Sequence, residues 1–181
     1  MQKLGFRFKI VVPDIDEASL HSESADRLAL RLAEEKCAAV AKDYPGDVVL
    51  AADTVVCVDG RILGKPRDTE DARAMLRLLS GREHLVMTGV CVQKGSERHS
   101  LVCTTSVLFD ELPDRLLDEY LKSGESLDKS GSYAVQGIAA MFVLEVRGSV
   151  SSVVGLPVAQ TRQLLEKFGL YYKYTDNTDG Q

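Results

Sequence analysis

The residue best placed to do chemistry is Asp53, a carboxylate that interrupts a long apolar run. Left charged and unpaired inside such a run, it would be strongly destabilising, so its surroundings must offer cations, a metal ion or hydrogen-bond donors. The alternative is an aspartate exposed where the run breaks, and position alone does not separate the two interpretations. Asp16 and Glu17 follow another apolar stretch. Asp53, Glu17 and Asp16 are therefore candidates to share one divalent ion.

Hard oxygen ligands of this kind suit Mg²⁺ or Mn²⁺, which retain waters and take phosphate oxygens as further ligands. We therefore expect a divalent metal cofactor and a phosphorylated substrate. Cations that could bind its phosphates are Lys36, Lys65, Arg67 and Lys129, and glycines that would let the backbone approach a ligand are Gly64, Gly131 and Gly137. Taken singly, each is also typical of a surface cation or a turn. Pro66 follows Lys65 where a P-loop needs Ser or Thr, which argues against a kinase or GTPase.

Apolar periodicity predicts the elements that carry these residues. Alternation over Phe6–Val12 predicts a strand, and helical spacing from Ser24 to Lys42 predicts a helix. The apolar run from Asp47 to Val58 predicts a central strand, which the Asp59-Gly60 turn joins to a short returning strand. Further along, we expect a helix over 68–79, strands over 85–92 and 101–109, a helix over 113–122, a loop over 124–137, strands over 139–146 and 150–154, and a helix over 157–168.

This order of elements predicts an α/β fold with a mixed, twisted sheet flanked by helices. The chain of 181 residues is long enough to bury one substantial core. We expect a single domain over residues 1–174 and a polar C-terminal tail over 175–181.

Composition excludes several classes of function. The formal net charge of −5 argues against nucleic acid or an anionic membrane as a partner. The four cysteines form no C-x-x-C pair and the three histidines are isolated, so neither a zinc cluster nor a histidine-based triad is predicted. The sequence has no apolar stretch of membrane-spanning length and no signal peptide at its start, so we expect a cytoplasmic protein.

Nine segments, in order and spacing, resemble the Maf family of nucleoside triphosphate pyrophosphatases. They are Pro13–Glu17, Leu30–Lys36, Ala52–Val56, Leu63–Pro66, Leu78–Gly81, Thr88–Val90, Leu127–Tyr133, Val135–Gly137 and Val153–Pro157. The resemblance implies an elongated α/β structure with two lobes around a cleft. It also implies hydrolysis of a nucleoside triphosphate between the α and β phosphates, which yields a monophosphate and pyrophosphate.

The resemblance assigns roles to individual residues. Asp53 matches the catalytic aspartate, Glu17 its acidic partner, and Lys36 and Lys65 the catalytic lysines. Asp53 would act as a base or metal ligand, Glu17 would share the metal, and the lysines would offset charge that develops on the phosphates. Lys129 and Gly137 are expected to bind substrate.

One departure concerns the start of the sequence. The family opens with a strand that carries a Ser-x-Ser-Pro-Arg-Arg segment, which binds the triphosphate, and this sequence begins downstream of it. We expect a weakened phosphate site that an upstream segment would restore, and exposed strand edges that favour a homodimer. Two alternatives stay open. One is a nucleotide-binding or septum-related protein without turnover, and the other is a metal-dependent phosphohydrolase that releases phosphate.

The segments around Asp53 and Gln136 predict the base. Ala52-Asp53-Thr54 and Tyr133-x-x-Gln136-Gly137 resemble the subfamily that acts on dTTP and UTP rather than on 7-methyl-GTP. An amide offers both a donor and an acceptor, which matches the O4 and N3–H edge of uracil or thymine. We therefore expect dTTP and UTP to be preferred over CTP and purine triphosphates, with Thr54 and Gln136 setting the preference. The alternative is that both side chains merely satisfy backbone groups.

Overall fold

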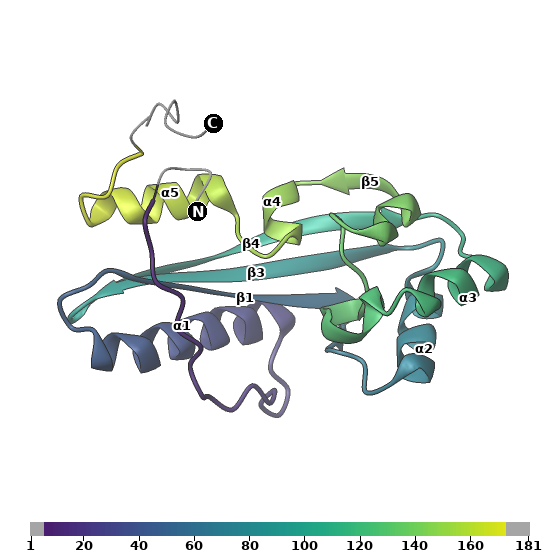
Figure 1. Cartoon of the computed structure of the whole chain (residues 1–181), viewed down its shortest axis with the longest axis horizontal. Helices are drawn as coiled ribbons and strands as arrows, with labels where there is room; N and C mark the ends of the chain where they lie inside the picture. Colours follow the sequence, from purple (N-terminus) through teal and green to yellow (C-terminus); the bar gives the residue numbers. More distant parts are fainter. Residues whose placement is uncertain (1–5, 173–181) are drawn as a thin grey trace, which may run out of the picture.

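The computed structural model describes residues 6–172, in which five strands form one sheet with helices on both faces (Figure 1). The strands are β1 (Val49–Val58), β2 (Arg61–Leu63), β3 (Glu83–Lys94), β4 (Glu97–Phe109) and β5 (Val143–Arg147). The α-helices are α1 (Ala25–Asp43), α2 (Thr69–Leu79), α3 (Asp114–Lys122), α4 (Val150–Val153) and α5 (Val158–Lys167), and the 3₁₀ turns are η2 (Glu125–Asp128), η3 (Ser130–Ser132) and η4 (Ile138–Phe142). The predicted polar tail over 175–181 lies outside the described residues.

The sheet has the strand order β2-β1-β3-β4-β5 and contains two hairpins. Gly60 and Gly95, at the turns of the β1–β2 and β3–β4 hairpins, both adopt positive φ, which glycine tolerates best. The predicted α/β class with a helix-flanked sheet is confirmed. The expected mixture of strand directions is not, because every strand pair within residues 6–172 is antiparallel. The two hairpins reverse the chain, and the connections through α2 and α3 also bring it back antiparallel.

Side chains of β1 alternate between the two faces of the sheet, as they must in a strand. Val55 and Cys57 pack on the face covered by α1. Leu50 and Ala52 pack on the opposite face, with side chains of α5. Asp53 therefore faces α1, and its neighbour Thr54 faces the side of α4 and α5.

Helix α1 lies unusually close to the sheet beside Asp53. The β3 residue paired with Asp53 is Gly89. A Cβ atom at Gly89 would overlap the backbone of Ala29 in α1. This glycine lets the helix backbone contact the strand directly. It thereby sets the distance between α1 and the sheet that later α1 side chains, including Lys36, must span.

The long strands β1, β3 and β4 connect two lobes (Figure 1). In one lobe, α1 and α5 cover opposite faces of the sheet. The other lobe contains α2, α3 and β5, and its core gathers Val56, Val58 and Leu63 with apolar side chains of both helices. The elongated, two-lobed shape matches the expectation from the family resemblance.

The predicted strand over residues 6–12 is wrong, because this segment has no regular structure. It crosses the β1 edge of the sheet instead of pairing along it: Phe6 packs with the α5-side cluster and Ile15 with the α1-side cluster. Val12 is consequently 88% exposed. A groove of about 720 Å³ lies between this segment and β1. Among the described residues, β2 pairs only with Val56–Val58, so the outer edge of β1 has no strand partner before Val56.

A second wrong prediction is the strand over 150–154, which is the short helix α4. The Oγ of Ser149 accepts a hydrogen bond from the N–H of Ser152 and caps this helix despite its β-branched valines. Residues 139–142, predicted as the start of a strand, belong to η4. The other predicted helices and strands are confirmed, with β3 and β4 longer than expected. None of the helices described has the length and apolarity that crossing a bilayer would require.

Candidate active site

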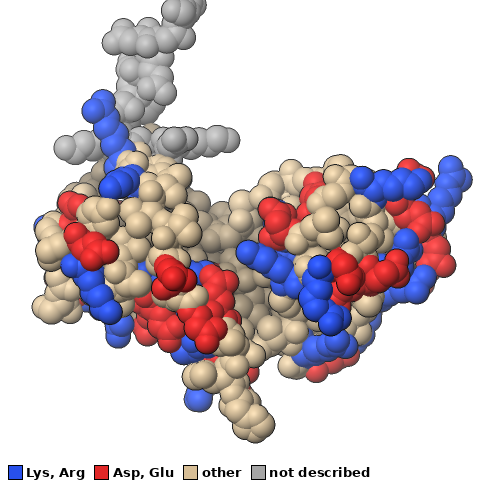
Figure 2. All heavy atoms as spheres, turned by 60° about the horizontal axis from the view of Figure 1, so that its bottom comes forward, with Lys and Arg blue, Asp and Glu red and all other residues tan. Residues whose placement is uncertain are grey.

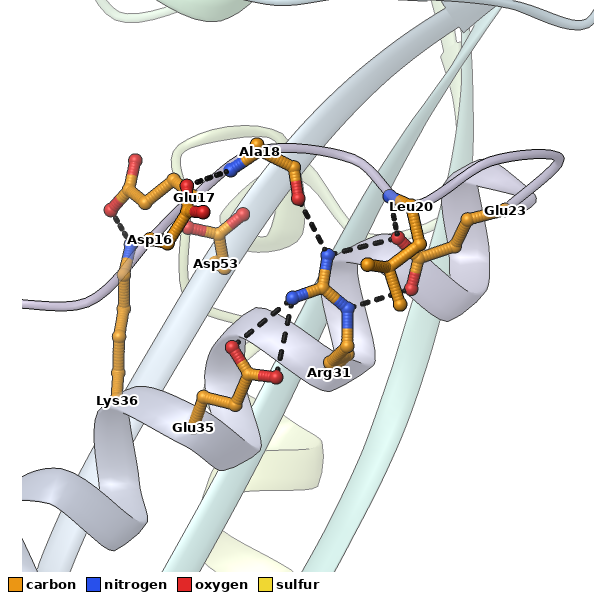
Figure 3. A network of polar contacts seen from close by, with 9 residues as sticks. All are labelled: Asp16, Glu17, Ala18, Leu20, Glu23, Arg31, Glu35, Lys36 and Asp53. Atoms are coloured by element: carbon orange, nitrogen blue, oxygen red, sulfur yellow. Dashed lines mark hydrogen bonds and ion pairs between the residues drawn. The ribbon is translucent and has the colours of Figure 1, made fainter.

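Three charged side chains predicted to act together meet at the α1 face of β1 (Figure 3). Lys36 Nζ, from the fourth turn of α1, lies 2.6 Å from Asp53 Oδ1 and 2.6 Å from Glu17 Oε1. The side chain of Asp53 is 14% exposed, whereas that of Glu17 is 53% exposed. One ammonium thus joins a largely buried carboxylate on the sheet to an accessible carboxylate on the segment that precedes α1.

The surroundings of this cluster shift the pKa values of two of its groups. Burial raises the pKa of the Asp53 carboxyl above its ordinary value, and the Lys36 ammonium offsets that rise only in part. Burial lowers the pKa of Lys36, but its hydrogen bonds to Asp53 and Glu17 outweigh that effect and leave the pKa raised. Lys36 therefore stays charged, while Asp53 becomes a stronger proton acceptor than an ordinary aspartate. A carboxylate with a raised pKa is suited to general-base catalysis.

Arg31 fixes the segment that carries Glu17, as Figure 3 shows. Its guanidinium donates to both carboxylate oxygens of Glu23 at 2.8 and 2.9 Å, to the Ala18 carbonyl at 2.9 Å, and to Glu35 at 3.1 Å. The Arg31 hydrogen bond holds the pKa of Glu23 at about 2. Because one rigid side chain spans the segment and α1, it limits how far Glu17 can move from Lys36.

A separate cavity of about 150 Å³ opens on the opposite face of β1. Its lining residues are Thr54, Val56, Lys65, Val86, Asp128, Lys129, Ser130, Tyr133, Val153, Val154 and Gly155. Lys129 Nζ lies 2.8 Å from Asp128. Tyr133 is a fixed wall, because its hydroxyl is 2.8 Å from Nε2 of buried His84. Apolar walls with a few polar groups are typical of a site for a small ligand.

Lys65 connects the cavity with the charged cluster. It lines the cavity, and its charge also lowers the pKa of Asp53 on the other face. Both sites are next to the part of β1 that has no strand partner on its outer side among the described residues. A ligand can therefore reach both faces around this edge. Figure 2 shows a hollow between the two lobes, with acidic side chains gathered on one lobe and basic side chains facing them from the other.

Other predicted site residues lie outside the two groups. Asp16 accepts a hydrogen bond from the Ala18 N–H, and Arg67 pairs with Asp71 of α2. Gln136 is exposed and does not line the cavity. Gly137 packs so closely on Glu125 that a Cβ atom there would overlap its carboxylate, which accepts the N–H groups of residues 138 and 139.

Sequence reasoning missed three contributors to the site. Thr88, whose Oγ1 lies 2.9 Å from Thr54 Oγ1, and Arg31 lie within segments that carried the family resemblance. Their residue types gave no signal of these contacts, since threonine and arginine are common on strands and helices. His84 looked isolated in sequence and meets Tyr133 only in the fold.

The carboxylates fit a magnesium-type ion only together with a ligand. Within residues 6–172, no three His, Cys, Asp or Glu side chains gather as a metal cage. Two carboxylates that leave other positions to water and phosphate are the usual protein share of a Mg²⁺ site in nucleotide enzymes. Asp53 and Glu17, both within 2.6 Å of the same ammonium, form such a pair.

Comparison with known proteins assigns the chain to a family. The family model described as Maf-like protein matches residues 1–168. The chain belongs to the Maf family. It is 50% identical to a dTTP/UTP pyrophosphatase of Anaeromyxobacter dehalogenans (strain 2CP-C) over 171 residues, which cover 92% of this chain and 86% of the relative.

Two other relatives of this Maf protein carry the same name. Identity is 47% over 170 residues to a dTTP/UTP pyrophosphatase of Myxococcus xanthus (strain DK1622), covering 94% of this chain and 86% of the relative. Identity is 46% over 169 residues to a dTTP/UTP pyrophosphatase of Vibrio parahaemolyticus serotype O3:K6, covering 93% of this chain and 89% of the relative. The family resemblance found in the sequence is confirmed.

Proposed function

We propose that this Maf protein hydrolyses dTTP and UTP to the monophosphate and pyrophosphate, with Asp53 as the catalytic base. The observation that carries the proposal is the cluster in which Lys36 lies 2.6 Å from both Asp53 and Glu17. The names of the relatives support the reaction and the substrates. The triphosphate lies beside the cluster, and the base enters the cavity lined by Thr54.

The charged residues divide proton transfer and charge stabilisation between them. Asp53 takes a proton from the attacking water, whose oxygen forms a bond to the α-phosphorus. The bond between the α-phosphorus and the bridging oxygen breaks, and pyrophosphate leaves with the electron pair. Lys36 and Lys65 offset the charge that develops on the phosphate oxygens, and Lys129 contributes a further cation from the cavity side.

Asp53 and Glu17 would hold a Mg²⁺ or Mn²⁺ ion with the substrate phosphates. When bound, such an ion lowers the pKa of water and neutralises phosphate charge. Glu17 is suited to this part because its accessible carboxylate can turn from Lys36 toward a ligand. Gly137 and Gln136 act from the adjoining loop, where Gln136 contacts the base from outside the cavity.

The test is product analysis with a panel of nucleotides. The full chain is incubated with dTTP, UTP, CTP, GTP and 7-methyl-GTP in Mg²⁺ or Mn²⁺, and pyrophosphate and phosphate are measured separately. Pyrophosphate with the matching monophosphate, fastest from dTTP and UTP, is expected. Release of phosphate alone would favour a different phosphohydrolase, and tight nucleotide binding without any product would favour a binding role.

A further inference from the structure

A chain of hydrogen bonds with a fixed direction runs behind the cavity. Thr54 Oγ1 lies 2.9 Å from Thr88 Oγ1, and Thr88 Oγ1 donates to the Ser152 carbonyl at 2.8 Å. A hydroxyl has one proton to give and a carbonyl has none. Because Thr88 donates its only hydroxyl proton to the Ser152 carbonyl, it must act as the acceptor in its bond with Thr54. Thr54 is therefore the donor in that bond. The structure thus fixes which threonine is the donor.

This direction determines what Thr54 offers to the cavity. Its only hydroxyl proton points at Thr88, so only oxygen lone pairs remain for a ligand. Thr54 and Gly155 both line the cavity. A Cβ atom at Gly155 would lie 3.7 Å from Thr54 Oγ1, so the glycine keeps the approach to this oxygen open. At this point the cavity presents an acceptor and no donor.

We infer that Thr88 is a positioning residue for base selection: it holds Thr54 as an acceptor for a pyrimidine whose N3 carries a proton. Uracil and thymine have N3–H and can donate to Thr54. Cytosine has a lone pair at N3, which would face the lone pairs of Thr54. The inference rests on the proposed function, since it assumes that the base lies in this cavity.

The surroundings of Thr88 allow a clean test. Thr88 is fully buried, between Thr54 and the backbone of α4. The Ser152 carbonyl also accepts the Gly155 N–H at 2.8 Å. It therefore keeps a partner when the Thr88 hydroxyl is removed, which limits the structural damage. Valine matches the shape of threonine without its hydroxyl, so Thr88→Val frees the Thr54 proton to turn toward the cavity.

The experiment compares kcat/KM for UTP and CTP in the unmodified chain, Thr88→Val and Thr88→Ser. The unmodified chain should prefer UTP. In Thr88→Val the UTP/CTP ratio should fall about tenfold, because Thr54 can now donate to cytosine N3, and the absolute rate with CTP should rise. Thr88→Ser keeps the hydroxyl and should hold the ratio within about threefold. A gain with CTP is a change that general damage to the fold would not produce.

Each other outcome is decisive. Equal losses with UTP and CTP in Thr88→Val would overturn the inference and leave the proposed function intact, as would an unmodified chain that hydrolyses both equally. An unmodified chain that releases no pyrophosphate from any pyrimidine triphosphate would overturn the proposed function and this inference with it. If Thr88→Val does not fold, Thr54→Val replaces it: the ratio should collapse there too, and an unchanged ratio would sink the inference.

Discussion

Asp53 and Thr54 are neighbours in the chain, yet their side chains lie on opposite faces of β1 and in opposite environments. On the α1 face, three charged groups meet, and one of them, Glu17, is accessible on an irregular segment. On the other face, Thr54 contacts a neutral hydrogen-bond chain whose central member, Thr88, is fully buried. The charged side is partly open to solvent, and the neutral side is enclosed.

This difference matches the two tasks of a nucleotide hydrolase. Phosphate transfer moves a proton and redistributes charge, so its groups need variable partners and access to water. Selection of a base needs donors and acceptors whose roles do not change, since a hydroxyl free to donate or to accept would bind both uracil and cytosine. A single strand separates these tasks because its side chains alternate, and the predictions below act on one face at a time.

The largest effect is expected from Asp53→Asn, which removes the base on the charged face. Pyrophosphate release should fall on the order of a thousandfold or more, because the amide keeps the shape but takes no proton. The melting temperature should change little, because two effects oppose each other. The neutral amide removes the cost of a buried charge whose pKa is raised, but it also takes one of two carboxylate partners from the Lys36 ammonium.

Asp59→Asn is the matched control for this variant. Asp59 follows β1 in the hairpin turn, and its side chain is 70% exposed. Its φ of 49° is one that asparagine also tolerates. Activity of this control should be unchanged. An Asp53→Asn protein that keeps most of the parent's activity would remove Asp53 from the role of base.

Lys36→Met should lower activity at neutral pH by roughly a hundredfold and shift its pH dependence. Asp53 must be deprotonated to act, so activity rises as the pH passes its pKa. The Lys36 ammonium lowers that pKa, and its loss should move the acid limb of kcat/KM to higher pH. Lys42→Met, near the end of the same helix, is the control. An acid limb that stays in place would show that Lys36 does not act on Asp53.

An N-terminal extension that carries a Ser-x-Ser-Pro-Arg-Arg segment should raise kcat/KM on the order of a hundredfold. Within residues 6–172, the edge of β1 has no strand partner before Val56, and a groove that Lys36 also lines runs beside it, so an added strand can pair close to Asp53. Each charge-assisted arginine–phosphate contact is worth roughly 1.5–3 kcal/mol. The same extension with both arginines replaced by glutamine should give little of the gain. Equal rates with and without the extension would show that the segment is dispensable.

Glu17→Gln should reduce activity about tenfold and raise the concentration of Mg²⁺ or Mn²⁺ needed for half-maximal rate. The amide removes one anionic oxygen from the proposed metal site while Asp53 stays in place. Asp14→Asn, an exposed change three residues earlier on the same segment, should leave the metal dependence unaltered. An unchanged metal titration in Glu17→Gln would exclude Glu17 as a metal ligand.

The charged face was more predictable from sequence than the neutral face, for a physical reason. A carboxylate within an apolar strand demands a partner, so Asp53 drew attention by itself, and the structure places the Lys36 ammonium between it and Glu17. Threonine, by contrast, is common in strands, as other β-branched residues are, so Thr88 did not stand out in the sequence. The inferred function of Thr88 depends on which group its hydroxyl donates to. The Ser152 carbonyl determines that in the fold, and no residue spacing in the sequence indicates it.

The same contrast holds for the fold. Elements with their own local signals, such as α2 with the Asp68 cap and the β1–β2 hairpin, are confirmed. Residues 6–12 have the alternation of a strand but cross the sheet edge, because a strand also requires a partner, and alternation says nothing about one. The α4 segment has strand-like valines, yet the Ser149 cap and its packing on β3 and β4 make it helical.

The smallest effect is expected from Gln136→Glu. We predicted that Gln136 and Thr54 set the base preference, but Gln136 is exposed and does not line the cavity, whereas Thr54 does. A contact made in water contributes little, so the preference for UTP over 7-methyl-GTP should fall only about threefold, through loss of the amide donor and attraction of the carboxylate to a cationic base. The measurement is the ratio of kcat/KM values for the two nucleotides at two salt concentrations. A threefold change that shrinks in high salt would fit this rim position, whereas no change at either concentration would exclude Gln136 from base selection.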